Sequence, residues 1–249
     1  MTYEAVNVDT RGYTLTGRFA VVTGATRGIG RAIAACLHAT GARVLGTGRG
    51  APGGLPEGCE FRAVDLGEAR AAAAFAEELR SAAPDILVNN AGVNRLAPFA
   101  ETDPATFELM HRTNVLGPML LCRAVLPEMR RRHWGRIVNI ASIWSKRSLP
   151  GRAAYSASKF ALDGLTAALA AEVAADGVLA NCVSPGFVDT ELLHAMIDEA
   201  QISELAAQVP MRRLAQPEEI AAFVVWLCGP ENTYISGQNL AIDGGYTRT

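Results

Sequence analysis

The chain has 249 residues, of which 49% are hydrophobic and 19% are charged. This length lies within the range of one α/β domain, and the composition is that of a globular protein with a full core. The formal net charge of −2 offers no basic surface of the kind that phosphate backbones require, which argues against nucleic acid as a partner.

The basic run Arg130–His133 is a local exception to this balance. At the end of an expected helix, such a run more often complements the negative helix terminus than binds a partner. The five cysteines are odd in number and lack CxxC spacing, which predicts reduced thiols and a cytoplasmic protein. The four histidines lack ligand spacing, so we expect no metal site. Residues 1–10 do not resemble a signal peptide, and no apolar run approaches the ~20 residues of a membrane span.

Short apolar runs alternate with longer Ala- and Leu-rich segments in chain order. The expected strands are Phe19–Val22, Val44–Leu45, Phe61–Val64, Ile86–Val88, Ile137–Ile140 and Leu179–Val183. The expected helices are Gly28–Thr40, Glu68–Ala82, Ala105–Arg131, Tyr155–Ala174 and Pro217–Cys228. Apolar strands alternating with helices predict a Rossmann-type, doubly wound parallel sheet with helices on both faces, a three-layer α/β fold.

No composition shift marks a second domain. We expect residues 1–14 to form an N-terminal arm and residues 15–249 to form one dinucleotide-binding catalytic domain. Residues 189–211 break the alternation with mixed apolar and acidic residues, so we expect them to be an insertion near the ligand that serves as a lid over the substrate.

The first expected strand ends in a glycine-rich turn, Thr23–Gly30, that continues into a helix. Glycines permit a tight turn and close approach of the backbone to phosphate, and the following helix N-terminus offers free N–H groups to an anion. The spacing is GxxxGxG and not the GxGxxG of the general dinucleotide fingerprint. Taken alone, it also fits an ordinary turn.

Polar and small residues follow the third and fourth expected strands, at Asp65-Leu66 and Asn90–Gly92. Asp65 could cap the next helix or accept a hydrogen bond from an adenine amino group. Asn90–Gly92 could be a simple turn, or its small residues could let the backbone lie against a flat cofactor.

Ser142 follows the fifth expected strand, and Tyr155 and Lys159 are four residues apart on one helix face. A tyrosine hydroxyl has an ordinary pKa near ~10, and a neighbouring ammonium and a positive nicotinamide would lower it. Ser142 could then hydrogen-bond a substrate oxygen while Tyr155 exchanges a proton with it. Taken singly, each residue also fits a structural role, Ser142 as a cap and Tyr155 as an aromatic residue at a helix start.

Together these motifs resemble the short-chain dehydrogenase/reductase family, from about Leu15 to Tyr246. The matching segments, in family order, are Thr23–Gly30, Asn89–Gly92, Asn114, Ser142, Tyr155–Lys159, Pro185–Thr190 and Gly237–Gly245. The resemblance implies a hydride transfer between a nicotinamide and a carbonyl or alcohol carbon. Within the family, the pattern is most similar to the 3-oxoacyl-carrier-protein reductases and their small-molecule relatives.

The resemblance also implies a role for each matching residue. Tyr155 would be the general acid/base, Lys159 would hold the nicotinamide ribose and lower the pKa of Tyr155, Ser142 would orient the substrate oxygen, and Asn114 would fix a relay water. The cofactor-binding set would comprise Gly24, Thr26, Arg27, Gly28, Ile29, Gly30, Arg49, Asp65, Leu66, Asn90, Ala91, Gly92, Tyr155, Lys159, Pro185, Gly186, Val188 and Thr190. All four catalytic positions are filled, which favours an enzyme over a nucleotide-sensing relative. Family members are usually homotetramers joined through the long helices and the C-terminal strand.

The position for an acidic ribose ligand, ~20 residues past the glycine turn, is Gly48. Arg49 follows it and Arg27 lies inside the turn, and both could reach a 2′-phosphate. NADP(H) is therefore favoured, with NAD(H) the alternative. Two activities fit: an NADPH-dependent ketoreductase, or an NAD-dependent dehydrogenase of an alcohol, sugar or polyol.

The substrate is a small molecule that the sequence does not name. The expected pocket residues are Asn94, Arg95, Trp144, Leu149, Phe187, Leu192, Leu193 and Met196. Arg95, Lys146 and Arg147 would add positive charge at its mouth, which suits an anionic or polar substrate. Asp176 follows the YxxxK helix where carrier-protein reductases often have a basic residue, which argues against a carrier-protein substrate, although Arg130–His133 partly compensates.

Overall fold

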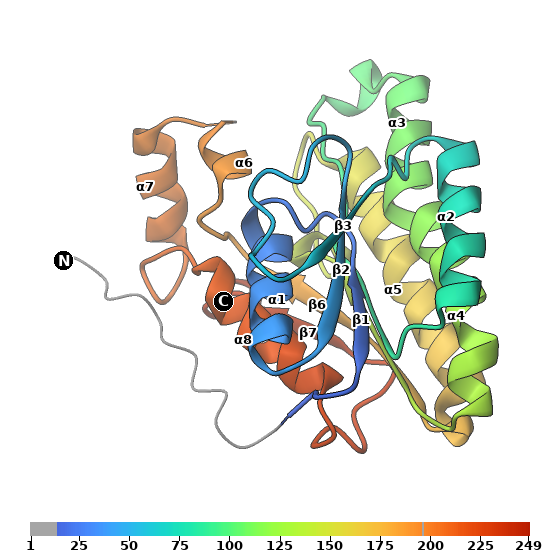
Figure 1. Cartoon of the computed structure of the whole chain (residues 1–249). Helices are drawn as coiled ribbons and strands as arrows, with labels where there is room; N and C mark the ends of the chain where they lie inside the picture. Colours follow the sequence, from blue (N-terminus) through green and yellow to red (C-terminus); the bar gives the residue numbers. More distant parts are fainter. Residues whose placement is uncertain (1–13, 196) are drawn as a thin grey trace.

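The computed structural model describes residues 14–195 and 197–249 (Figure 1). Seven strands in these residues form one parallel sheet in the order β3-β2-β1-β4-β5-β6-β7. The strands are β1 Phe19–Val22, β2 Arg43–Gly48, β3 Glu60–Ala63, β4 Ile86–Asn89, β5 Gly135–Ile140, β6 Val178–Pro185 and β7 Asn239–Ile242. The strand order reverses between β1 and β4. This arrangement confirms the predicted Rossmann-type fold, while the predicted arm lies outside the described residues except for Thr14.

Helices cover both faces of the sheet, as Figure 1 shows. On one face lie α1 (Gly28–Ala39) and α8 (Pro217–Cys228), and on the other lie α2 (Ala69–Ala82), α4 (Gly117–Arg131) and α5 (Ala153–Val173). The remaining α-helices among the described residues are α3 (Pro104–His111), α6 (Glu191–His194) and α7 (Glu199–Gln208). Single 3-10 turns lie at Phe99–Glu101, Ile143–Ser145, Ala174–Asp176 and Tyr246–Arg248.

The central strands are apolar on both faces because each face supplies a separate core. Ala20 and Val22 of β1 pack with the α1 and α8 layer, whereas Phe19 and Val21 pack with the α2, α4 and α5 layer. Alternate side chains of a strand point to opposite faces, so the run is apolar without a gap.

The expected helix Ala105–Arg131 is helical throughout, but a π-helical turn at Arg112–Leu116 divides it into α3 and α4. Pro118 has no N–H to donate to the carbonyl of Asn114, four residues earlier. Instead, the N–H of Gly117 bonds to the carbonyl of Arg112, five residues earlier. The turn therefore accommodates an extra residue between α3 and α4.

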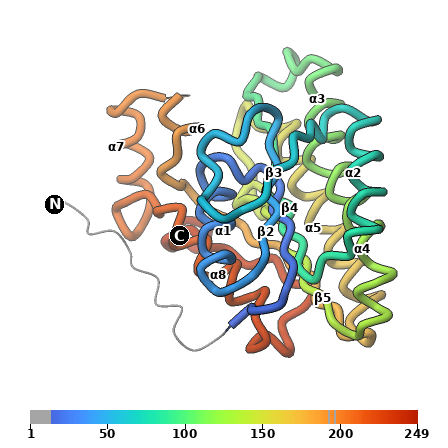
Figure 2. The backbone as a smooth tube through the Cα atoms, viewed as in Figure 1, coloured from blue at the N-terminus to red at the C-terminus, as the bar shows by residue number. Residues whose placement is uncertain are grey.

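Residues 189–211, expected to be an insertion, leave the sheet after β6 and form α6 and α7 before the chain returns to α8. Figure 2 shows these two short helices standing apart from the layers of the sheet. α7 begins with a capping box, in which the Asp198 carboxylate accepts from the N–H of Gln201 at 2.8 Å and the Gln201 amide accepts from the N–H of Asp198 at 3.1 Å.

Candidate active site

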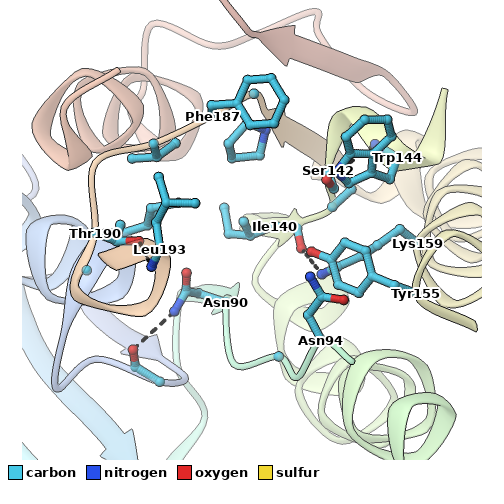
Figure 3. A pocket seen from close by; sticks show the side chains of 18 of the residues that line it. Asn90, Asn94, Ile140, Ser142, Trp144, Tyr155, Lys159, Phe187, Thr190 and Leu193 are labelled. Carbon is cyan, nitrogen blue, oxygen red and sulfur yellow. Dashed lines mark hydrogen bonds between the residues drawn. The ribbon is translucent and has the colours of Figure 1, made fainter. Parts of the chain in front are cut away.

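A cavity of about 330 Å³ opens beyond the carboxyl ends of β1, β4, β5 and β6, where the strand order reverses (Figure 3). Ligands of open α/β sheets bind at this position. The predicted site residues that line it are Gly24, Arg27, Gly28, Ile29, Gly30, Asn90, Ala91, Gly92, Ser142, Tyr155, Lys159, Pro185, Gly186, Val188 and Thr190. The fold thus gathers motifs that are far apart in the sequence into one cavity.

The glycine-rich turn is fastened to the segment after β4. The Thr23 hydroxyl accepts from the N–H groups of Asn90 and Ala91, each at 3.0 Å. The Asn90 amide donates to the carbonyls of Thr23, at 2.9 Å, and Gly24, at 3.1 Å. A side chain at Gly30 would collide with the Gly24 carbonyl and with the Asn90 amide. These contacts show why glycine is needed at this position of the turn, and they fix the shape of the turn before any ligand binds.

Ser142, Tyr155 and Lys159 form one group at the other side of the cavity (Figure 3). The Ser142 hydroxyl lies at the end of β5, accepts from the N–H of Trp144 at 3.3 Å, and lines the same cavity as the Tyr155 side chain. Lys159 follows one turn later on α5, with Nζ 5.6 Å from the centre of the Tyr155 ring. That ammonium is buried and donates to the carbonyl of Ile140 at 2.7 Å.

The protein environment shifts the pKa values of both titratable groups. Burial raises the pKa of Tyr155, and the Ser142 hydrogen bond and the Arg152 charge act in the opposite direction. Burial lowers the pKa of Lys159 to about 8. Neighbouring positive charge is expected from the sequence to lower the pKa of Tyr155. In the folded chain, burial outweighs this effect, and the cation that lowers the pKa is Arg152.

The lowered pKa of Lys159 predicts a pH-dependent stability. Between pH 8 and 10.5 the unfolded chain binds more protons at this lysine than the folded chain does, so its contribution to the free energy of unfolding rises with pH across that window. We expect the free energy of unfolding of wild type, minus that of Lys159→Met, to rise by about 3 kcal/mol from the low to the high end of this window. Denaturant unfolding at several pH values measures it, and Lys146→Met is the control. A flat difference would contradict the prediction.

Asn114 lies outside the cavity wall, buried in the π-helical turn. Its side chain exchanges two hydrogen bonds of 2.9 Å with the backbone of Val93 and donates to the Ser158 hydroxyl at 3.0 Å. A Cβ added to Gly92 would lie 3.3 Å from Asn114 Oδ1 and 3.7 Å from Lys159 Nζ. Asn114 therefore ties the segment after β4 to α5 directly beside Lys159.

Thr26, Arg49, Asp65 and Leu66 do not line the cavity. Asp65 accepts from the N–H of Gly67 at 2.8 Å in the turn before α2, whose N-cap residue is Glu68, and Leu66 packs in the core. Arg49 is exposed directly after β2, and Thr26 lies against Gly48, the last residue of that strand. Thr26 and Arg49 thus lie at the end of β2, and Asp65 and Leu66 follow β3, so none of the four belongs to the catalytic group.

The substrate pocket matches the expected residues only in part. Asn94, Trp144, Phe187 and Leu193 line the cavity, whereas Arg95, Lys146, Arg147 and Leu149 do not. The three cations have other partners: Arg95 donates to the Asn94 carbonyl, Lys146 donates to the Asn239 carbonyl, and Arg147 lies over the Tyr246 ring. Met196 and the Leu192 side chain lie outside the described part of the chain.

The cavity also contains residues that the sequence analysis missed: Leu96, Ile140, Ala141, Arg152, Glu191, Ile197 and Leu205. A signal for Arg152 was present, because it stands only three positions before Tyr155, at the N-cap of the same helix. In place of the basic residues expected at the mouth of the pocket, Arg152 lies on the cavity wall.

The basic run at the end of α4 is engaged in ion pairs, which agrees with its structural interpretation. Arg130 pairs with Asp176 at 2.7 Å, Arg131 pairs with Glu128 at 2.6 Å, and Arg132 pairs with Asp85 at 3.1 Å. Among the described residues, no cluster of three metal-ligating side chains is present. In the same residues, no helix is long and apolar enough to cross a membrane.

Known proteins match this chain along nearly its whole length. A family model described as enoyl-(acyl carrier protein) reductase matches residues 24–247. The chain is 37% identical to 3-oxoacyl-(acyl-carrier-protein) reductase FabG of Vibrio cholerae, covering 93% of this chain and 98% of that protein. It is 39% identical to D-threitol dehydrogenase of Mycolicibacterium smegmatis, covering 94% and 95%.

The structural comparison gives the same family. A candidate NAD(P) dependent gluconate 5-dehydrogenase of Beutenbergia cavernae, solved with NADP bound at low occupancy, matches with a TM-score of 0.88 and 39% identity. The match covers 95% of this chain and 99% of that one. With the sequence motifs gathered around one cavity, these findings establish that the chain belongs to the short-chain dehydrogenase/reductase family.

Proposed function

We propose that this chain is an NADP(H)-dependent oxidoreductase that reduces a ketone to a secondary alcohol, with Tyr155 as the proton-transfer residue. The observation that carries the proposal is the grouping of Ser142, Tyr155 and buried Lys159 on the same cavity as the glycine-rich turn. The reductase and dehydrogenase relatives support this reaction class.

The cavity fits a dinucleotide because glycines stand where the cofactor would lie and leave room for it. A Cβ at Gly92 would fill the space between Asn114 and Lys159, and Gly24 and Gly28 adopt φ values of +68° and +51°, which favour glycine. The turn and the N-terminus of α1 would hold the pyrophosphate, and Pro185–Thr190 the nicotinamide. The bound nicotinamide would supply the hydride for reduction and accept it for oxidation.

The residues of the protein would carry out the proton transfer that accompanies hydride transfer. In the reducing direction, Ser142 hydrogen-bonds the carbonyl oxygen and the Tyr155 hydroxyl donates its proton to that oxygen as it becomes an alcohol. Lys159 Nζ would bind the ribose and keep positive charge near Tyr155, which favours the phenolate left behind. Asn114 would hold the water that returns the proton.

A second candidate is an NAD-linked dehydrogenase of an alcohol, sugar or polyol, which the likeness to D-threitol dehydrogenase supports. Following nicotinamide absorbance at 340 nm against a panel of ketones, oxo acids, polyols and acyl thioesters, in both directions and with both cofactors, separates the two activities. Cofactor binding without turnover of any substrate would instead support a nucleotide sensor and contradict both.

Free small molecules, and not carrier-bound acyl chains, are the proposed substrates. The basic run that could meet an acidic carrier is neutralised, because Arg130 pairs with Asp176. We also propose a cytoplasmic location, which the five free cysteine thiols support.

The segment Glu191–Val209 is proposed to close over the bound substrate as a lid. Leu193, Ile197 and Leu205 line the cavity from this segment, so closure would exclude water from hydride transfer. We expect its amide hydrogens to exchange much faster than those of the sheet, and to slow when NADP+ and a substrate are bound. Hydrogen-exchange mass spectrometry tests this, and exchange as slow as in the sheet and unaffected by ligands would contradict it.

The chain is further proposed to form a homotetramer through its long helices and C-terminal strand. Apolar side chains of the α3 to α5 layer are exposed, among them Leu116 and Phe160 at 40% and 47%. We expect light scattering to give a mass four times the 26.3 kDa of one chain, and Phe160→Glu to lower it. Ala51→Glu, in the exposed loop after β2, should leave the mass unchanged. A monomeric wild type at working concentration would contradict the proposal.

A further inference from the structure

One charged side chain on the cavity wall has no role in the proton transfer described above. Four charged side chains among the described residues line the cavity: Arg27, Arg152, Lys159 and Glu191. Lys159 donates to the Ile140 carbonyl, and Glu191 pairs with Arg31 at 3.3 Å. Arg27 begins α1 inside the glycine-rich turn, on the side assigned to the pyrophosphate. Arg152 is thus the charged group that remains for the substrate.

Arg152 is held in place by packing and not by a carboxylate. Its guanidinium lies 4.5 Å from the centre of the Trp144 ring, a cation–π contact with a buried side chain. No acidic side chain of the described residues forms an ion pair with it. A half-buried guanidinium that is stacked on one face keeps its edge N–H groups for a planar anion.

The position of Arg152 places that anion close to the reacting carbon. Arg152 is the N-cap residue of α5, three residues before Tyr155, and its charge is close enough to act on the Tyr155 hydroxyl. Trp144, whose ring contacts the Arg152 guanidinium, lies beside Ser142 and Tyr155 in Figure 3. An anion on Arg152 would therefore belong to the same small molecule whose oxygen meets Ser142 and Tyr155.

A second polar group in the cavity also lacks a partner. Asn94 Oδ1 is buried and has no hydrogen-bond partner among the described residues, and Figure 3 shows the Asn94 side chain beside Tyr155 and Lys159. A buried amide without a partner is unfavourable unless a ligand supplies one. Its oxygen suits a substrate hydroxyl, so the cavity offers one site for an anion and one for a hydroxyl around the reacting carbonyl.

We infer that the substrate is a small oxo- or hydroxycarboxylate, whose carboxylate is bound by Arg152 while its carbonyl or alcohol oxygen meets Ser142 and Tyr155. This inference deepens the proposed function and rests on it. It assigns Arg152 as a residue that determines specificity, and it excludes neutral ketones and polyols as preferred substrates.

The test compares an oxo acid with its methyl ester, which keeps the carbonyl and removes the charge. Oxo acids with the keto group at successive positions are assayed as acid and ester in wild type, Arg152→Gln and Arg152→Lys. We expect wild type to favour at least one acid over its ester, and Arg152→Gln to lower kcat/KM for that acid ten- to hundredfold while changing the ester less than threefold. Arg152→Lys should restore part of the loss. Arg147→Gln is the matched control, because Arg147 also stacks on an aromatic ring but lies outside the cavity.

A binding measurement separates failure of this inference from failure of the proposed function. An oxo acid with NADP+ forms a dead-end complex that cannot react, so calorimetry reports its affinity without turnover. Tighter binding of an acid than of its ester, lost in Arg152→Gln, supports the inference. Esters bound or reduced as well as their acids, or equal losses for both in Arg152→Gln, would overturn it while leaving the reductase intact. Failure to bind either nicotinamide cofactor would overturn both.

Discussion

Tyr155→Phe is expected to lower kcat by about 10²- to 10⁴-fold, the usual contribution of general acid–base catalysis. The substitution keeps the ring and removes the hydroxyl, and with it the transferable proton. The glycine-rich turn is fastened by Thr23 and Asn90, which the substitution does not touch. Cofactor binding should therefore persist, as measured by NADPH fluorescence titration next to steady-state kinetics.

A neighbouring tyrosine provides the control for this experiment. Tyr246 is buried in an aromatic cluster with Trp144 and Phe187 but does not line the cavity. Tyr246→Phe removes a hydroxyl from the same region and should leave kcat within a few-fold of wild type. If Tyr155→Phe kept half of the wild-type rate, Tyr155 could not be the proton donor.

Arg49→Ala is expected to weaken NADPH binding ten- to hundredfold and to leave NADH nearly unaffected. The guanidinium follows β2 directly and is exposed, and a charged hydrogen bond to the 2′-phosphate is worth about 1.5–3 kcal/mol. Arg43→Ala is the matched control, because Arg43 is also exposed but lies at the opposite end of β2, paired with Glu60 at 3.1 Å. The measurement is kcat/KM for both cofactors. A wild type that prefers NADH tenfold would overturn the cofactor assignment.

Gly48→Asp is expected to shift the preference towards NADH, because a carboxylate there would repel a 2′-phosphate and accept from the ribose hydroxyls. The structure adds a constraint, since a Cβ at Gly48 would lie 2.9 Å from Thr26 Cγ2. Combining Gly48→Asp with Thr26→Ser relieves that contact. If the double variant keeps the thermal stability of wild type and still prefers NADPH, the end of β2 does not decide the cofactor.

The fold could be predicted because its signal is local and repeated. Each apolar run is typical of a buried strand and each Ala-rich segment of a helix. Glycines in the sequence mark turns between them. The π-helical turn could not be predicted in this way. It depends on the bond from Gly117 to Arg112 and on the amide contacts of Asn114 with Val93, a segment on another element.

The candidate site shows the same division. Residues in short motifs, such as Asn90–Gly92 and Tyr155–Lys159, could be chosen in advance, and the cavity brings them together. The cations of the substrate pocket could not be chosen in advance, because the sequence does not show whether the side chain of a loop arginine points into the cavity or away from it. Arg95 and Arg147 turn to the Asn94 carbonyl and the Tyr246 ring, whereas Arg152 faces the cavity.

The π-helical turn has a consequence for which changes in chain length this protein can tolerate. Each residue of an α-helix turns it by roughly 100°, given 3.6 residues per turn. Deleting one residue within Arg112–Leu116 would remove the extra residue and allow a regular helix with α3 and α4 in their present places, but it would rotate Asn114 by up to that angle and move it away from Val93. The exposed Gly- and Pro-rich loop at residues 50–54 carries no such coupling. Insertions and deletions among homologues should therefore collect in loops of that kind, while the spacing between α3 and α4 stays constant even where the side chains change.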